Sequence, residues 1–185
     1  MTQTSAPVAQ RLFRHRSPYA LTEPKYEAAI ELLSSAIAHG GPIAAVIGIA
    51  GGGTAPAEQL ATQLGVPVSH LAARHNSSDA LYVQATGTVT VTVPASFPEA
   101  LAGRVVLVDD ICGTGTTFTA VTNALAARLT SDARVDTVAL CRNVGSPTRP
   151  SWWVWDVDDW VVFPWEPRPD IPVRPLALPE RVLTP

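Results

Sequence analysis

The chain has 185 residues, of which 46% are apolar and 16% charged, and 13 basic against 16 acidic side chains give it a formal net charge of −3. This composition is typical of a folded, single-domain protein and excludes a disordered or fibrous chain. The slight negative charge disfavours broad nucleic-acid binding. The longest apolar run, Pro42 to Ala50, is far shorter than the ~20 residues of a membrane-spanning helix, so we expect no membrane segment.

The first part of the chain predicts an N-terminal arm, residues 1–23, followed by a single domain over residues 24–185. Most of the arm is polar, and we expect it to be flexible. A helix begins at Pro24, because apolar residues recur after it at spacings of three and four, namely Tyr26, Ala29, Ile30, Leu33 and Ile37. Gly40 and Gly41 are predicted to end this helix.

The middle of the chain predicts alternating strands and helices. A run of Ile, Val and Ala at residues 43–49, bounded by glycines, indicates a buried strand. A helix over residues 56–64 and a strand over residues 66–71 follow. Two further short runs, Leu81–Gln84 and Thr88–Val93, are separated by a turn and predict a β-hairpin.

Residues 104–110 form the clearest predicted strand, in which four consecutive aliphatic residues lead to Asp109 and Asp110. A helix over residues 116–129 and a strand over residues 135–141 follow, before a tryptophan-rich segment and a proline-rich end. Strands that alternate with helices indicate an α/β fold with a central, largely parallel sheet flanked by helices.

The most informative feature is the turn that follows Asp109 and Asp110. Open α/β sheets bind ligands at this edge, and the next residues combine glycines, hydroxyls and the start of a helix, which favour a phosphate. These residues are Gly113, Thr114, Gly115, Thr116 and Thr117. Because carboxylates repel phosphate, the acids are predicted to hold sugar hydroxyls or a phosphate-bound Mg²⁺. A structural alternative is that they only cap the helix.

A second glycine-rich turn lies upstream between a strand and a helix, at Ala50, Gly51, Gly52 and Gly53. Its bare amides offer a second anion site, so the two turns together predict a ligand with phosphates at both ends. A dinucleotide-binding fingerprint fails at its third glycine, and no Gly-Lys-Thr of a Walker loop is present. A nucleotide-cofactor oxidoreductase is therefore the weaker alternative.

The sequence from Val105 to Thr117 resembles the motif with which type I phosphoribosyltransferases bind phosphoribosyl pyrophosphate (PRPP). Ile47–Ala57 is similar to the pyrophosphate loop of that family, and Asp159–Glu166 to the C-terminal segment of its purine-type members. The resemblance implies a Mg²⁺-dependent, homodimeric enzyme with a small C-terminal hood. It would transfer ribose 5-phosphate from PRPP to a nitrogenous, purine-like base and release pyrophosphate.

The resemblance also implies a role for each matching residue. Asp109 and Asp110 would be the catalytic acids that face the ribose hydroxyls and the metal. Residues 113–117 would hold the 5-phosphate, and Ala50–Gly53 the pyrophosphate. Residues 73–93 would form a mobile loop that closes over the reaction. Trp160, Val161 and Arg142 would contact the base. Arg74 and His75 lie in the proposed loop, where they could assist the pyrophosphate or act as a general acid, and a solvated pair is the simpler interpretation.

Three departures from the family leave the base and the turnover open. Gly113 stands where 6-oxopurine enzymes commonly carry an aspartate that serves the base, and Gly51 where the pyrophosphate loop often carries Arg or Lys. Arg142 falls near the lysine that reads the 6-oxo group, and the two side chains differ in donor geometry. The alternative prediction is a regulatory protein that binds PRPP or a nucleotide without turning it over.

Other chemistry-bearing residues have simpler interpretations. The chain lacks an apolar secretion signal, and its two cysteines are expected to be reduced thiols in the cytoplasm, with Cys112 in a packing role. Asp156, Asp158 and Asp159 are expected to form an exposed acidic turn rather than a metal site. A basic cluster near the N-terminus, Arg11, Arg14, His15 and Arg16, is interpreted as a solvated tail. The sequence leaves open whether Arg14, His15, Arg16 and Tyr19 fold over the site or over a partner subunit.

Overall fold

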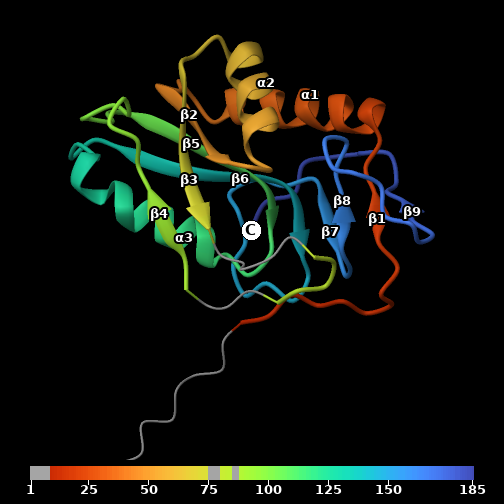
Figure 1. Ribbon diagram of the computed structural model, residues 1–185. Coiled ribbons are helices and arrows are strands. Elements are labelled where there is room, and N and C mark those ends of the chain that lie inside the picture. The colour runs from red at the N-terminus through yellow and green to blue at the C-terminus, as the bar shows by residue number, and fades with distance from the viewer. Residues whose placement is uncertain (1–8, 75–79, 85–87) are drawn as a thin grey trace, which may run out of the picture.

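The computed structural model describes residues 9–74, 80–84 and 88–185 (Figure 1). Its main sheet has six strands in the order β4-β3-β2-β5-β6-β7. Their bounds are β2 Ala45–Ala50, β3 Val68–Arg74, β4 Thr90–Thr92, β5 Arg104–Cys112, β6 Arg134–Asn143 and β7 Trp155–Val157. Every neighbouring pair is parallel except β3 and β4. The predicted α/β fold with a largely parallel sheet is confirmed.

Helices cover both faces of this sheet (Figure 1). Helices α1 (Glu23–His39) and α2 (Thr54–Leu64) pack on one face. Helix α3 (Thr116–Leu125) packs on the other and continues into a short 3-10 turn, Ala126–Arg128. In β5, Val106 and Val108 face the α1 and α2 side, and Val105 and Leu107 face α3. Burial on both faces explains why this strand is a continuous aliphatic run.

A second, three-stranded sheet forms the hood. It consists of β1 (Tyr19–Ala20) between β8 (Val161–Val162) and β9 (Arg174–Pro175), with both pairings parallel. The hood predicted from the C-terminal segment therefore also contains residues of the predicted N-terminal arm. Figure 1 shows the segment before β1, in red, passing beneath the ends of β3, β5 and β6 on its way to the hood.

The predicted hairpin is wrong in its first strand. Residues 81–84 form a turn, in which Tyr82 has a φ of +65°. Strand β4 instead pairs with β3 in antiparallel register, and Val91 packs into the core beside α3. The alternation of Thr and Val in β4 suits any neighbouring strand, and β3 provides the free edge. The predicted turn at residues 85–87 lies outside the described residues.

A buried ion pair ties α1 to the sheet. Arg104 Nε lies 2.6 Å from Asp136 Oδ2, and the two side chains are 8% and 5% exposed. Arg104 Nη1 also donates to the carbonyls of Ile37 and Gly41, both at 2.8 Å. The other carboxylate oxygen of Asp136 contacts Arg134, which is 67% exposed. No helix among the described residues is long and apolar enough to span a bilayer.

These two arginines predict very different losses of stability. Arg104→Gln leaves the buried carboxylate of Asp136 without its main partner and is expected to lower the free energy of unfolding by about 3–5 kcal/mol. Arg134→Gln removes only the exposed partner and is expected to cost less than about 1 kcal/mol. Urea unfolding of both variants measures this difference, and equal losses would contradict the assignment.

Candidate active site

Two adjacent carboxylates lie near the end of β5. Asp109 and Asp110 are both half-buried, and the Asp110 N–H donates to Asp109 Oδ1 at 3.0 Å. Burial and the neighbouring charge of Asp110 hold the pKa of Asp109 well above its ordinary value. Burial also raises the pKa of Asp110, although the positive charge of Arg11 opposes this shift. The pair therefore sits in surroundings that favour a bound cation.

The glycine turn between β2 and α2 lies directly against these acids. A Cβ on Gly52 would be 1.8 Å from Asp110 Oδ2, and one on Gly53 would be 2.5 Å from the carbonyl oxygen of Val108. Glycine is therefore required at both positions for the turn to approach β5. Gly51 has a φ of +105° and no atom within 4 Å of the place a Cβ would take. No side chain caps the amides that begin α2.

The second glycine turn, residues 113–117, leads from β5 into α3. Gly115 has a φ of +85° and, as the residue before the helix, provides no side-chain cap; the Thr116 N–H donates to Thr114 Oγ1 at 3.4 Å. The hydroxyls of Thr114 and Thr116 lie 2.9 Å apart. A Cβ on Gly115 would be 2.2 Å from Cβ of Thr148, so the turn is backed by the segment after β6. The two predicted phosphate turns thus flank the acid pair.

Arg142 makes contacts other than the predicted one with a base. Its Nε and Nη2 donate to the carbonyls of Thr148 at 3.4 Å and Ser146 at 3.2 Å, and its Nη1 lies 2.9 Å from Asp156. The side chain is 11% exposed. These contacts hold the segment behind the second turn, and they do not favour Arg142 as a reader of the base, which stays a prediction.

Trp160 lies beside β8 in a group of aromatic rings. The ring centroids of Phe13 and Tyr82 are 6.0 and 6.3 Å from that of Trp160, and the guanidinium carbon of Arg11 is 5.3 Å from it. The carbonyls of Trp160 and Val162 accept hydrogen bonds from the β1 side, so the backbone groups of Val161 point away from β1. Trp160 and Val161 remain predicted base contacts.

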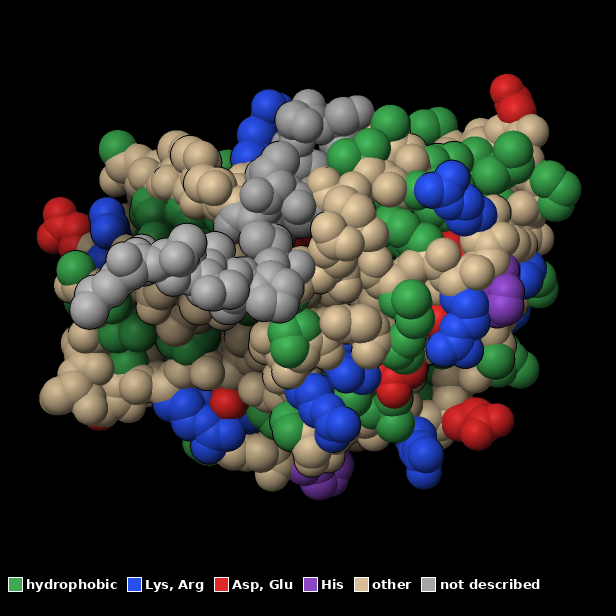
Figure 2. Space-filling model, turned by 90° about the horizontal axis from the view of Figure 1, so that it is seen from below, with side chains coloured by type: hydrophobic (Ala, Val, Ile, Leu, Met, Phe, Trp, Pro, Cys, Tyr) green, Lys and Arg blue, Asp and Glu red, His purple; other side chains and the backbone are tan. Residues whose placement is uncertain are grey.

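The sequence did not indicate three members of this group. Arg11, Phe13 and Tyr82 are brought to Trp160 by chain crossings that have no local periodicity. The basic cluster was the only available signal for Arg11. Figure 2 looks onto this edge of the sheet and shows basic side chains gathered over the part of the face that is not grey.

The predicted exposed acidic turn is wrong for Asp158 and Asp159, whereas Asp156, in β7, is exposed. Asp159 is completely buried, and its Oδ2 accepts hydrogen bonds from the backbone of His15 and Ser17. Asp158 accepts a hydrogen bond from the Tyr19 hydroxyl and pairs with Arg14. All three acids of this turn are therefore bound by other residues. Among the described residues, no group of three or more His, Cys, Asp or Glu side chains could hold a metal.

Other predicted residues lie at the margins of the site. Arg74 is the exposed last residue of β3 rather than part of a loop, and His75 lies outside the described residues. Cys112 hydrogen-bonds Ser146 and the carbonyl of Thr148, and burial raises the pKa of its thiol to about 11. The thiol is thus protonated at neutral pH, which agrees with a packing role.

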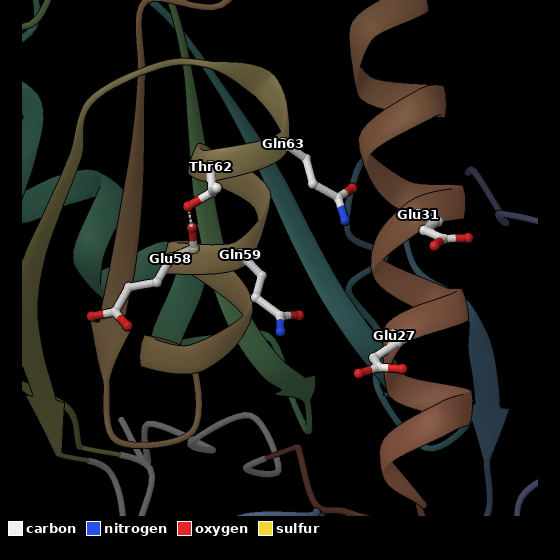
Figure 3. A pocket seen from close by; sticks show the side chains of 6 residues that line it. All are labelled: Glu27, Glu31, Glu58, Gln59, Thr62 and Gln63. Carbon is white, nitrogen blue, oxygen red and sulfur yellow. Dashed lines mark hydrogen bonds between the residues drawn. The ribbon is translucent and has the colours of Figure 1, made fainter.

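A hollow between α1 and α2 is a poor alternative site for phosphates (Figure 3). It has a volume of about 400 Å³ and is lined by Glu27, Glu31, Glu58, Gln59, Thr62 and Gln63. Three carboxylates with no basic residue in the lining repel an anionic ligand. The anion-binding features of the described residues gather at the C-terminal edge of the sheet instead.

Comparison with known proteins identifies the class. Residues 20–172 match the model of the phosphoribosyl transferase domain, so the chain belongs to this family. A purine phosphoribosyltransferase from Pyrococcus horikoshii is 26% identical, with a TM-score of 0.69 over 83% of this chain and 97% of that chain. No curated protein matches the chain.

More distant structures share the fold. A xanthine-guanine-hypoxanthine phosphoribosyltransferase from Helicobacter pylori is 17% identical, with a TM-score of 0.63 over 80% of this chain and 93% of that chain. A hypothetical protein from Neisseria gonorrhoeae with bound ppGpp is 24% identical, with a TM-score of 0.58 over 82% of this chain and 91% of that chain.

The raised pKa of Asp109 predicts a pH-dependent change in stability. A carboxyl whose pKa is raised by folding stabilises the protein below its unfolded pKa of ~3.9, and this contribution is lost as the pH rises through the folded pKa. Asp109→Asn is therefore expected to have a higher urea midpoint than the unaltered protein at pH 8, with a difference that shrinks towards pH 4.

Asp132 provides a control of opposite sign. Hydrogen bonds from Thr130 and Gly103 lower its pKa. The stability that Asp132 contributes is present above its unfolded pKa and is lost as the pH falls through its folded pKa. Asp132→Asn should therefore lower the urea midpoint at pH 8. An Asp109→Asn variant that is less stable than the unaltered protein at pH 8 would contradict the electrostatic description of the site.

Proposed function

We propose that the protein catalyses Mg²⁺-dependent transfer of the 5-phosphoribosyl group from PRPP to a nitrogenous, purine-like base, with release of pyrophosphate. The observation that carries the proposal is the acid pair at the end of β5, flanked by two glycine turns that each lead into a helix whose N-cap residue is a glycine without a side-chain cap. One acid pair between two anion sites suits a sugar with a phosphate at each end. Membership of the phosphoribosyl transferase domain family supports the proposal.

Each part of PRPP has a matching group of residues. Residues 113–117 would hold the 5-phosphate at the start of α3, and Ala50–Gly53 would face the pyrophosphate at the start of α2. Asp109 and Asp110 would hold the ribose hydroxyls and Mg²⁺, which binds carboxylate oxygen. When bound, Mg²⁺ neutralises charge on the leaving pyrophosphate.

The reaction needs positioning more than a strong nucleophile. A ring nitrogen of the acceptor forms the new bond to the anomeric carbon, while the bond to pyrophosphate breaks and its electron pair leaves with the pyrophosphate oxygen. The proton of the acceptor nitrogen passes to solvent. Asp109 and Asp110 hold the sugar in place, and exclusion of water prevents hydrolysis of the electron-poor ribose. The thiol of Cys112, protonated at neutral pH, takes no part.

A regulatory protein that binds PRPP or a nucleotide without turnover is the second candidate. It is favoured by the absence of a side chain at Gly113 and by the guanidinium of Arg11, which lies over the ring of Trp160. The cytoplasmic location and the homodimer stay predictions under both proposals.

The two candidates are separated by calorimetric titration of PRPP with and without Mg²⁺, followed by a panel of purine and pyrimidine bases while pyrophosphate is measured. We expect Mg²⁺-dependent PRPP binding and pyrophosphate release with at least one base. Tight binding without release would favour the regulatory protein, and no PRPP binding would contradict both. Asp109→Asn with Asp110→Asn should abolish binding and release, whereas Asp132→Asn should leave them unchanged.

Trp160→Ala tests the acceptor side of the proposed site. Loss of a stacking ring is expected to raise the KM for the base roughly tenfold or more, and to leave the affinity for PRPP nearly unchanged. Trp165→Ala is the matched control, because Trp165 stacks on Phe163 and is 37% exposed. Equal losses for base and PRPP in Trp160→Ala would indicate a purely structural tryptophan.

A further inference from the structure

The segment before β1, residues 10–17, which we call the strap, is bound to the site edge by polar side chains. Asn143 is completely buried; its Oδ1 accepts the Leu12 N–H at 2.8 Å, and its Nδ2 donates to the Leu12 carbonyl at 3.0 Å. Gln84 makes the same pair of hydrogen bonds with the backbone of Arg11, at 3.0 and 2.8 Å. The strap backbone is therefore held on two sides at these positions.

A second anchor fixes the following residues of the strap. The buried carboxylate of Asp159 accepts the N–H groups of His15 at 2.9 Å and Ser17 at 3.2 Å. A buried charge or amide is costly without partners, so removal of the strap would cost Asp159 Oδ2 two N–H donors and leave it with Arg174 at 3.5 Å, and would remove the described partner of Asn143 Nδ2. A Cβ on Gly145 would lie 3.0 Å from the strap backbone, so glycine there permits the close approach. The strap therefore forms a wall of the site that is anchored at Arg11, Leu12, His15 and Ser17.

Arg11 projects from this wall into the centre of the predicted site. Its guanidinium carbon is 5.3 Å from the centroid of Trp160, and a Cβ on Gly113 would lie 2.6 Å from its Nε. Burial lowers the pKa of Arg11, whereas the charges of Asp110 and then Asp109 raise it. Arg11 therefore lies where the predicted sites for the 5-phosphate, the ribose and the base meet.

The hydrogen-bonding capacity of this guanidinium is available to a ligand. The hydrogen bonds of Arg11 with other described residues all come from its backbone, whereas Arg142 uses three nitrogens within the chain. Arginine is always charged and presents five N–H donors in a plane. It therefore matches a carboxylate or a ring oxygen on a flat ligand, and it repels a cationic or donor-only edge.

We propose that Arg11 is a specificity-determining residue of the acceptor site, which selects a heterocyclic acceptor that presents an anionic or carbonyl oxygen towards Gly113. The inference rests on the proposed transferase and names the class of its acceptor. Gly113 and Arg11 are matched, because any side chain at position 113 would displace the guanidinium.

The test compares Arg11→Ala and Arg11→Lys with Arg14→Ala, an exposed arginine of the same strap that pairs with Asp158. Each variant is titrated with Mg²⁺ and PRPP, then with acceptors that differ in one oxygen group: uracil against orotate, and hypoxanthine against xanthine. Acceptor binding is followed by heat and turnover by pyrophosphate release. Gly113→Ala provides a second variant, because it should displace Arg11 without removing it.

We expect the unaltered protein to prefer the acceptor with the additional oxygen group in at least one pair. Arg11→Ala should weaken binding of that acceptor about ten- to hundredfold, the range set by one hydrogen bond to a charged group, and leave PRPP binding unchanged. Arg11→Lys should recover part of this loss, and Arg14→Ala should show none. Gly113→Ala should weaken acceptor binding as Arg11→Ala does; its effect on PRPP binding is measured separately, because Gly113 also belongs to the proposed 5-phosphate turn. The double variant Arg11→Ala with Gly113→Ala should bind the acceptor no more weakly than Arg11→Ala alone, because both changes act on the same guanidinium.

Four results would overturn the inference. Equal weakening of PRPP and acceptor by Arg11→Ala would indicate a structural residue, and tighter PRPP binding with faster turnover would indicate a plug that blocks the site. A preference for acceptors without the additional oxygen, or no acceptor binding at all, would exclude the proposed acceptor class. Absence of pyrophosphate release alone would contradict the transferase but not the inference, because acceptor binding in the presence of PRPP is measured separately.

Discussion

Repulsion between two neighbouring carboxylates at the end of β5 is the constraint on which the rest of the site depends. Burial raises the pKa of both Asp109 and Asp110, and the charge of Asp110 raises the pKa of Asp109 further. Such a pair is costly unless the surroundings supply positive potential. The N-terminal ends of α2 and α3 and the guanidinium of Arg11 supply that potential here.

The parts of this arrangement that could be predicted from the sequence are local in the chain. Continuous aliphatic residues in β5 indicate burial on both faces, and the glycines after β2 and β5 lie where a backbone must approach closely. Gly52 makes the point clearly, because a single Cβ there would overlap Asp110. The order of strands and helices, the acid pair and the two turns follow from such short-range patterns.

The parts that could not be predicted depend on contacts between distant residues. Leu12 meets Asn143 and His15 meets Asp159 across more than 130 positions of sequence, and neither pair has any periodicity that would announce it. An acidic run such as Asp158–Asp159 normally indicates solvent exposure, yet strap amides stabilise Asp159 in the interior. The alternation of Thr and Val in β4 suits a pairing with residues 81–84 as well as one with β3. The free edge of β3 in the folded sheet decides the pairing.

The contrast between short-range patterns and long-range contacts also separates the two halves of the proposed site, one for the sugar phosphates and one for the acceptor. The residues proposed to bind the sugar phosphates come from adjacent strand ends of one rigid sheet, where the repulsion between the acids fixes what can surround them. The residues beside the proposed acceptor come from the strap and the hood, near both ends of the chain, and they are joined by side chains such as Asn143 and Asp159. Gly113 lies at the boundary between the two halves. With no side chain of its own, it leaves a space that the cation of Arg11 occupies. The charge of the wall facing the acceptor therefore comes from a different part of the chain than the acid pair, and the two halves meet electrostatically, because Arg11 also opposes the rise that burial causes in the pKa of Asp109 and Asp110.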